Sequence, residues 1–299
     1  MKVNLGGIVP LSTVDWIGFA STVVFLRGCP LRCPHCQNRE LQEGESSTEL
    51  YALFSQIARL VKGESVVKRL HPEKVRVPKG ASSEQINLDD ASERAASKPF
   101  VNALVLSGGE PLMQPRPAAA LLRLANSLGL ETGLETSGYY PDRLVGLLEK
   151  NVVDRVFLDL KASLKEPHYE RATGVRDASG RVKKSLEVCM RSGVPLEVRT
   201  TIFPEMPSAS DVAEIATTIS ELMSEFPRNH LEEMVLQQGR PAPGGSEVSA
   251  FEPVALDSLD EMAAAMGDLV KVRIRAEPNV GLGKTYNHRG PGQGGRTKV

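Results

Sequence analysis

The sequence predicts an α/β protein whose parallel strands form a partial (β/α)6 barrel. Short β-branched runs alternate with amphipathic helical stretches, and several of these stretches end at a glycine or are followed by a proline. Such alternation implies right-handed βαβ units and a parallel sheet. Six repeats are too few for an eightfold barrel. We therefore expect an open barrel that forms a single domain over residues 1–299.

Seven apolar runs are interpreted as strands of this sheet, and the stretches between them have helical periodicity. The expected strands are Ser21–Leu26, Asn102–Ser107, Glu131–Glu135, Arg155–Leu160, Leu196–Ile202, Glu233–Gln238 and Val270–Ala276. The expected helices are Thr48–Val61, Ala118–Leu128, Asp142–Lys150, Val182–Ser192, Asp211–Phe226 and Leu256–Met266.

Two segments depart from the alternation. Residues 62–99 are polar, carry mixed charge and are too long for an ordinary strand-to-helix connection, so we expect a surface insertion. Residues 285–299 are rich in glycine and basic side chains. A flexible tail is the expectation for them, and contact with an acidic partner is the alternative.

Composition limits the classes of function. A formal net charge of −1 argues against a nucleic-acid clamp or a membrane-surface module. No apolar run approaches the roughly 20 residues that span a bilayer, and the N-terminus lacks the pattern of a secretory signal. We therefore expect a cytoplasmic protein. In that compartment clustered thiols are better explained as metal ligands or redox groups than as disulfides.

Cys29, Cys33 and Cys36 lie within eight residues, directly after the first expected strand. Structural zinc needs four ligands, but Cys189 lies in an apolar helix and is expected to be a core thiol. His35 stands between two of the cysteines, where it is poorly placed to complete a tetrahedron. A thioredoxin-like pair would leave Cys29 unexplained. An iron–sulfur cluster accounts for all three thiols and leaves its fourth iron open to a substrate.

Polar clusters follow the later expected strands, at the carboxyl ends where parallel barrels keep their sites. Asp159 and Lys161 are two residues apart, so they share one face of their strand. A charged pair inside a barrel is costly unless it is paired or bound to a ligand, so a salt bridge and a ligand contact are both open. The remaining clusters are Ser107 to Glu110, Glu135 to Ser137, Arg199, and Gln237 with Gln238.

The cysteine spacing, C-x3-C-x2-C in the loop after a first strand, resembles the signature of the radical S-adenosylmethionine (SAM) enzymes. The resemblance implies a radical SAM type of barrel and a [4Fe-4S] cluster held by Cys29, Cys33 and Cys36. In that family the open iron binds SAM, and an electron from the cluster cleaves SAM to methionine and a 5′-deoxyadenosyl radical. The cofactors carry the chemistry, while the protein supplies ligation, orientation and exclusion of water.

The resemblance also implies contacts with SAM. Gly108 to Glu110 match the GGE-type motif that holds the SAM amino group, and Lys161 is expected to meet the SAM carboxylate. His35 is expected to stack on adenine. A monovalent cation is expected near Glu135 and Asp159. The residues implied for cofactor binding are His35, Asn38, Gly108, Gly109, Glu110, Glu135, Thr136, Ser137, Asp159, Lys161, Arg199 and Gln238.

Within that family, the opening "STVDWIGF", Asn38 after the third cysteine, "LETSG" and "LDLK" are similar to the activases of glycyl-radical enzymes. The branch that they resemble most is the anaerobic ribonucleoside-triphosphate reductase activating proteins. This implies a glycyl radical installed on that reductase, with ferredoxin or flavodoxin as a low-potential electron donor. Ile17, the position of His35 and Gln238 depart from the usual pattern of the activases.

Two other functions remain open. One is a radical SAM enzyme acting on a small molecule, in cofactor or modified-nucleoside biosynthesis. The other is an iron–sulfur electron carrier, which would have no use for the clusters Gly108–Glu110 and Asp159–Lys161.

The motif "PNVGLGKT" has the ending of a phosphate loop. It lacks the first glycine of that loop and a following helix, so we do not expect nucleotide-phosphate binding there.

Overall fold

The computed structural model describes residues 1–62, 100–241, 251–276 and the short strand at 285–286. One ten-stranded sheet organises the chain, in the order β10-β9-β8-β7-β6-β5-β4-β2-β1-β3. The strands are β1 (Lys2–Ser12), β2 (Ser21–Leu26), β3 (Ser47–Glu49), β4 (Ala103–Gly108), β5 (Glu131–Thr136), β6 (Arg155–Asp159), β7 (Leu196–Ile202), β8 (Leu231–Gln238), β9 (Val272–Arg275) and β10 (Thr285–Tyr286).

The strands from β2 and β4 through β9 pair in parallel, each with its neighbour along the chain. Strands β1, β3 and β10 are antiparallel additions at the two edges. The parallel part consists of six strand-to-helix units followed by β9, which confirms the partial (β/α)6 barrel.

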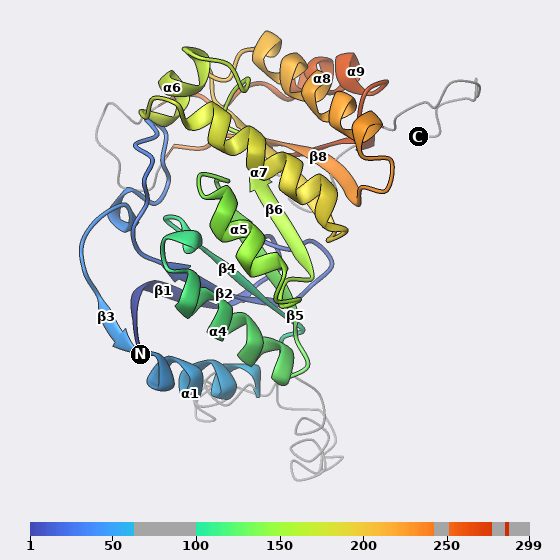
Figure 1. Cartoon of the computed structure of the whole chain (residues 1–299). Coiled ribbons are helices and arrows are strands. Elements are labelled where there is room, and N and C mark those ends of the chain that lie inside the picture. The colour runs from blue at the N-terminus through green and yellow to red at the C-terminus, as the bar shows by residue number, and fades with distance from the viewer. Residues whose placement is uncertain (63–99, 242–250, 277–284, 287–299) are drawn as a thin grey trace, which may run out of the picture.

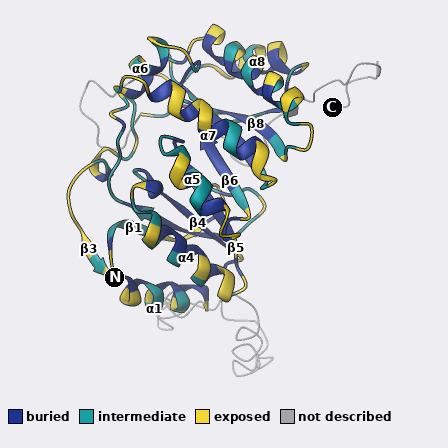
Figure 2. Ribbon diagram, viewed as in Figure 1, coloured by how far each residue is buried: buried dark blue, intermediate teal, exposed yellow. Residues whose placement is uncertain are grey.

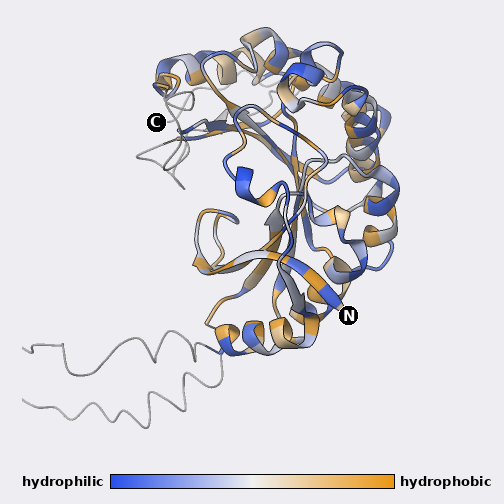
Figure 3. Ribbon diagram, turned by 90° about the vertical axis from the view of Figure 1, so that its left-hand side faces the viewer, coloured by the Kyte–Doolittle hydropathy of each residue, from blue (hydrophilic) through white to orange (hydrophobic). Residues whose placement is uncertain are grey.

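Helices cover the convex side of the curved sheet, and the concave side stays open (Figures 1 and 3). Among the described residues, none of the helices combines the length and apolar character needed to cross a membrane. The α-helices are α1 (Leu50–Val61), α4 (Pro115–Ser127), α5 (Pro141–Leu148), α6 (His168–Thr173), α7 (Ala178–Ser192), α8 (Ala209–Glu225) and α9 (Leu256–Met266), and the short 3-10 turns are η1 (Arg39–Leu41) and η3 (Pro111–Met113).

Strand residues alternate between the two sides of the sheet, and both sides are buried (Figure 2). Outward residues such as Val24 and Leu106 pack with the helices in the main apolar core. Inward residues of the first parallel strands, including Val23 and Val105, form a second, smaller core with Trp16. Burial on both faces explains why these strands are continuous apolar runs in the sequence.

Strands β2 and β7 and helix α9 have the predicted boundaries, and the other predicted elements differ by a few residues at their ends. The sequence analysis missed β1, in which adjacent glycines (Gly6 and Gly7) and Pro10 interrupt the alternation of apolar residues. This strand pairs antiparallel with β2 through two register shifts. The first strand of the fold therefore precedes the one that was predicted.

Two further differences concern connections. Helix α6, with six residues after Pro167, lies in a segment interpreted as a polar connection. The expected tail at 285–299 begins with a strand instead, because Thr285 and Tyr286 pair with β9. The rest of the tail and the expected insertion, apart from Lys62 at its start, lie outside the described residues.

Candidate functional site

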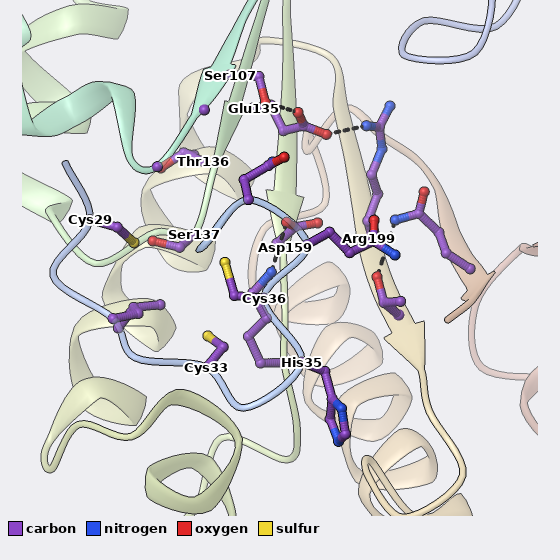
Figure 4. A pocket seen from close by; sticks show the side chains of 18 of the residues that line it. Cys29, Cys33, His35, Cys36, Ser107, Glu135, Thr136, Ser137, Asp159 and Arg199 are labelled. Carbon is purple, nitrogen blue, oxygen red and sulfur yellow. Dashed lines mark hydrogen bonds and ion pairs between the residues drawn. The ribbon is translucent and has the colours of Figure 1, made fainter. Parts of the chain in front are cut away.

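The three clustered cysteines lie on the loop that leaves the carboxyl end of β2, and their sulfur atoms turn toward the ends of β5 and β6 (Figure 4). Cys29, Cys33 and Cys36 are all partly buried, whereas Cys189 is fully buried in α7, as predicted for a core thiol. Burial raises the pKa of Cys29 to about 12 and also raises the pKa of Cys33. These thiols therefore stay protonated until a bound metal cation favours the thiolate.

Backbone hydrogen bonds fix this loop at both ends. The amides of Gly28 and Cys29 donate to the carbonyls of Leu41 and Gln42, at distances of 2.7 and 3.1 Å. Farther along, the amide of Arg32 donates to the carbonyl of Thr173 at the end of α6, at 2.7 Å. Helix α6, which the sequence analysis missed, is thus part of the support of the cysteine loop.

A pair of glycines joins the cysteine loop to the end of β4. A Cβ at Gly108, whose φ is +124°, would lie 2.3 Å from the carbonyl oxygen of Leu26, and a Cβ at Gly109 would lie 2.2 Å from that of Gly28. The amide of Gly109 donates to Leu26, and that of Glu110 donates to Gly28, each at 2.8 Å. Only glycine permits such a close approach of two backbones.

Glu110 is fully buried and does not line the cavity, which differs from the contact with the SAM amino group that the resemblance implies. Its carboxylate accepts hydrogen bonds from the amide of Leu112, the hydroxyl of Thr136, and both the amide and the hydroxyl of Ser137. Burial raises the pKa of Glu110, and these donors oppose the shift. In this structure Glu110 holds the Thr136–Ser137 turn against the glycine pair.

The other predicted site residues line one cavity of about 650 Å³ at the carboxyl ends of the parallel strands. This volume lies within the usual range for small-molecule sites. The structure thus brings together side chains that are more than 200 residues apart in the sequence. The predicted residues on the cavity wall are Cys29, Cys33, His35, Cys36, Asn38, Gly108, Gly109, Glu135, Thr136, Ser137, Asp159, Lys161, Arg199 and Gln238.

Asp159 and Lys161 form a salt bridge of 2.9 Å inside the cavity, with both side chains about one quarter exposed. Although burial lowers the pKa of Lys161, the carboxylate of Asp159 outweighs burial and raises that pKa above its usual value. Lys161 is therefore a fixed cation on the cavity wall, close enough to Cys33 for the two groups to interact electrostatically. A ligand carboxylate could share this ammonium group with Asp159.

Glu135 is bonded through both carboxylate oxygens: Oε1 accepts from Nη1 of Arg199 at 2.6 Å, and Oε2 accepts from the hydroxyl of Ser107. Arg199 is buried and also donates to Glu197 and to the carbonyl of Asp15. With both oxygens of Glu135 engaged and a guanidinium beside them, these residues do not fit a monovalent cation. We assign no role to such a cation.

His35 projects toward the far wall of the cavity, where its ring stacks on Phe203 with 4.5 Å between centroids and 21° between planes. The edge of Phe251 completes an aromatic group around it. Gln238 donates to the carbonyl of Val254 at 2.8 Å and so connects β8 to the chain before α9. A planar base could extend this aromatic stack, which is compatible with the expected adenine contact of His35.

The arrangement of Cys29, Cys33 and Cys36 differs in how well it suits a zinc ion and an iron–sulfur cluster. Among the residues that the structure describes, no three histidine, cysteine or acidic side chains come together around a single ion. A zinc ion would need such a convergence. In an iron–sulfur cluster each cysteine ligates its own iron, so three thiols spread along a loop around a common space fit the cluster.

Several cavity residues escaped the sequence analysis. Asp15, Phe203, Met206 and Arg240 belong to loops, for which periodicity gives no signal. Arg275 could have been found, because the charged residues of "VRIR" alternate with apolar ones, as they do in β7.

The fold and the site define a partial-barrel protein that carries a thiolate-bound group at the carboxyl ends of its strands. The model of the radical SAM superfamily matches residues 23–218, from β2 into α8. The chain therefore belongs to the radical SAM superfamily. This family implies a [4Fe-4S] cluster and SAM as cofactors, in agreement with the donor set of the cysteine loop.

Curated relatives include activating enzymes. The isethionate sulfite-lyase activating enzyme of Nitratidesulfovibrio vulgaris is 28% identical over 238 residues, which is 67% of this chain and 75% of that protein. The pyruvate formate-lyase 2-activating enzyme of Escherichia coli is 32% identical over 196 residues, covering 61% of each chain. The pyruvate formate-lyase-activating enzyme of Clostridium pasteurianum is 24% identical over 224 residues, covering 73% of this chain and 77% of that protein.

Solved structures support the fold. SuiB of Streptococcus suis, in complex with S-adenosylmethionine, superposes with a TM-score of 0.55 at 15% identity over 84% of this chain. The chain spans about half of SuiB, 48% of its length. TYW1 with a lysine–pyruvate adduct gives a TM-score of 0.55 at 14% identity, covering 88% of this chain and 79% of TYW1. At these identities the likeness concerns the fold alone.

Proposed function

We propose that this chain is an activating enzyme that installs a glycyl radical on a partner enzyme. The observation that carries the proposal is the similarity to activating enzymes, which extends over three quarters of the length of the isethionate sulfite-lyase activating enzyme. The three-cysteine loop and the polar cavity beside it supply the site that such a reaction needs. When bound, the cluster and SAM would supply a 5′-deoxyadenosyl radical that removes a hydrogen atom from the glycine Cα.

Under this proposal, the residues of the chain ligate and orient the cofactors. Cys29, Cys33 and Cys36 would ligate three irons, and Lys161 would contact the SAM carboxylate from the wall next to Cys33. The glycine pair would hold the cysteine loop against the end of β4, because side chains there would clash with the backbone of Leu26 and Gly28. Glu110, from behind, would keep this wall in position through Ser137.

An exposed apolar residue on the cavity wall suits a polypeptide substrate. Val14, on the β1–β2 connection, lines the cavity while remaining 45% exposed. It is therefore available to contact another protein. A segment of a partner enzyme could therefore lie along the β1–β2 connection while its glycine reaches the cavity.

As the partner we propose anaerobic ribonucleoside-triphosphate reductase, with ferredoxin or flavodoxin as the low-potential electron donor. The stretch "STVDWIGF" and Asn38 support this choice, because they resemble the activating proteins of that reductase. Trp16, within this stretch, is buried against the inner face of the sheet, and the carbonyl of Asp15 accepts a hydrogen bond from Arg199. The stretch thus borders the cavity from which the partner would be attacked.

The first experiment tests the radical chemistry. Protein reconstituted anaerobically with iron and sulfide should show a cluster signal that shifts on addition of SAM, and with a low-potential reductant it should form 5′-deoxyadenosine. Cys33→Ala should abolish this product, whereas Cys189→Ala, which removes the buried thiol of α7, should leave it unchanged. Continued formation of 5′-deoxyadenosine by the Cys33→Ala protein would refute the proposed cluster ligation.

The second experiment identifies the partner. The reconstituted protein, SAM and reductant are mixed with anaerobic ribonucleotide reductase and, separately, with pyruvate formate-lyase. Electron paramagnetic resonance should show a glycyl doublet on the reductase. A doublet on the lyase alone would correct the choice of partner, and cleavage of SAM without a doublet on any glycyl-radical enzyme would refute the proposed activity.

A further inference from the structure

The cavity has a second polar end, away from the cysteine loop, where β8 and β9 finish. Gln237 and Arg275 lie on adjacent strands in register, and both line the cavity. Nη1 of Arg275 donates to Oε1 of Gln237 at 2.8 Å, and Nε2 of Gln237 is directed at the hydroxyl of Thr201, 3.4 Å away. Gln237 thereby orients the guanidinium of Arg275 at the cavity wall.

Within the described part of the chain, the ion pairs on β5 to β9 contain more cations than carboxylates. Four carboxylates and five cations form them, so one cation has to share a carboxylate. The carboxylate of Asp15, which also lines the cavity, is bonded to the hydroxyl of Ser12 and is not an ion-pair partner of these cations. The carboxylates are Glu135, Glu197, Glu232 and Glu233, and the cations are Arg155, Arg199, Lys271, Arg273 and Arg275.

Of these cations, Arg275 lies farthest from its nearest carboxylate. Its nearest carboxylate is Glu197, at 3.5 Å, and Arg199 already contacts the same oxygen of Glu197 at 2.7 Å. Arg155, Lys271 and Arg273 each have a carboxylate closer than this, Glu232 for Arg155 and Glu233 for the other two. The surplus positive charge is therefore located at Arg275, the one end of this network that combines a cavity-lining position with a distant carboxylate.

Burial makes this charge costly. The side chain of Arg275 is only 10% exposed, and its Nε is buried without a hydrogen-bond partner in the described structure. Burial, followed by repulsion from Arg199, lowers the pKa of Arg275 to about 10. A negatively charged ligand against the cavity side of the guanidinium would give this cation a partner.

We propose that Arg275, oriented by Gln237, binds a carboxylate of the substrate at the β8–β9 end of the cavity. The inference deepens the proposed function and rests on it for the source of that carboxylate. With a polypeptide substrate the group is an acidic side chain close to the target glycine. The same chemistry would accept the carboxylate of a small molecule, so the experiment includes both sources.

Binding is measured on the reconstituted protein with SAM and without reductant, so that no turnover occurs. The fluorescence of Trp16, the single tryptophan of the chain, reports on the cavity because its neighbour Asp15 lines it. One pair of probes is N-acetyl-Gly-Glu-amide and N-acetyl-Gly-Gln-amide, and the other is N-acetylglycine and N-acetylglycinamide. The dissociation constant of each acid should be at least about tenfold lower than that of its amide. Equilibrium dialysis of the same probes provides a second readout.

Variants locate the effect. Arg275→Gln should reduce the preference for acid over amide to about one. Lys271→Gln is the matched control, because Lys271 belongs to the same charge network but does not line the cavity, and the preference should survive there. Equal binding of acid and amide by the unmodified protein would overturn the proposal without any variant. A preference that persists in Arg275→Gln would overturn it as well.

The outcomes separate this proposal from the proposed function. A glycyl doublet on a partner, without a preference for acids, would refute the carboxylate site and leave the activating function standing. A preference for acids that depends on Arg275, without a doublet on any partner, would do the reverse. A stronger effect in the dipeptide pair than in the acetylglycine pair assigns the carboxylate to a side chain of a polypeptide.

Discussion

The concave side of the barrel is filled in two different ways. Over β2 and β4 the inward residues are mostly apolar, and Val23 and Val105 pack with Trp16 and with Phe157 of β6. Over β7 to β9 most of the inward residues are arginines and glutamates held in one network. The two halves meet where the guanidinium of Arg199 lies 4.0 Å from the centre of the Phe157 ring.

The two inner faces differ in what they contribute, and the apolar one serves stability alone. An apolar inner face needs little more than matching volume, and its contribution depends weakly on pH or salt. A buried network of charges costs more free energy to assemble and depends on every partner being present. Because the charged half reaches the cavity through Arg199 and Arg275, we interpret its cost as the consequence of building a site there.

Removing a charge at the boundary should have the largest effect. Arg199→Met would leave the buried carboxylate of Glu197 and the partly buried carboxylate of Glu135 without their closest cation. The free energy of unfolding should fall by about 3–5 kcal/mol, measured by urea denaturation at neutral pH. A loss below about 1 kcal/mol would mean that the network rearranges freely and that the contrast between the halves is wrong.

Adding volume to the apolar half should have the next largest effect. A Cβ at Gly133, on β5, would lie 2.9 Å from Cε2 of Phe157 and 3.2 Å from the indole of Trp16. Gly133→Ala should therefore reduce the free energy of unfolding by about 1–3 kcal/mol. Gly7→Ala on β1 is the control, because a Cβ there meets nothing within 4 Å and should cause no loss. Equal losses in both variants would contradict the tight packing of this half.

Acid should weaken the charged half selectively. Burial opposes ionisation of Glu197, but the surrounding arginines outweigh burial and lower its pKa below the ordinary value of 4.5. Its contribution to stability is therefore present above about pH 4.5 and is lost as the pH falls through the lower pKa of the folded state. Between about pH 5 and pH 3 the unmodified protein should lose stability more steeply than Glu197→Gln. Parallel curves would show that Glu197 titrates alike in the folded and unfolded states.

The rim of the network should have the smallest effect. Lys271 contacts Glu233 at 3.3 Å but is 45% exposed, and Glu233 is also paired with Arg273. Lys271→Gln should change the free energy of unfolding by about 0–1 kcal/mol, and high salt should remove the difference. A loss as large as that of Arg199→Met would mean that the contribution of an ion pair in this network does not decrease with its exposure to solvent.

The sequence allowed the sheet to be predicted well because most of its strands are buried on both faces. Strands β2 and β7 have the predicted boundaries, since the run of β2 ends at Arg27 and Gly28 and that of β7 lies between Pro195 and Pro204. Strand β1 was missed because its pattern is broken by glycine and proline, and its place in the sheet depends on pairing with β2. Helix α6 is too short for periodicity to reveal it.

Most of the residues predicted for the site line one cavity, but the way in which they pair was not predicted. Alternation places Asp159 and Lys161 on one face, and the structure pairs them. Alternation does not reveal that Glu110 turns away from the cavity toward Ser137, or that Arg199 occupies Glu135. Those contacts join separate strands, so they depend on the register between strands, which the order of residues along one strand does not specify.

The contact between Gly108–Gly109 and the backbone of Leu26 and Gly28 also limits how this protein can be altered. The backbones of the cysteine loop and of the end of β4 pack directly against each other, so the two segments would have to be transferred together. A cysteine loop grafted onto another barrel would need the paired glycines of the next strand as well. Design of new enzymes on this scaffold should treat both segments as a single cassette.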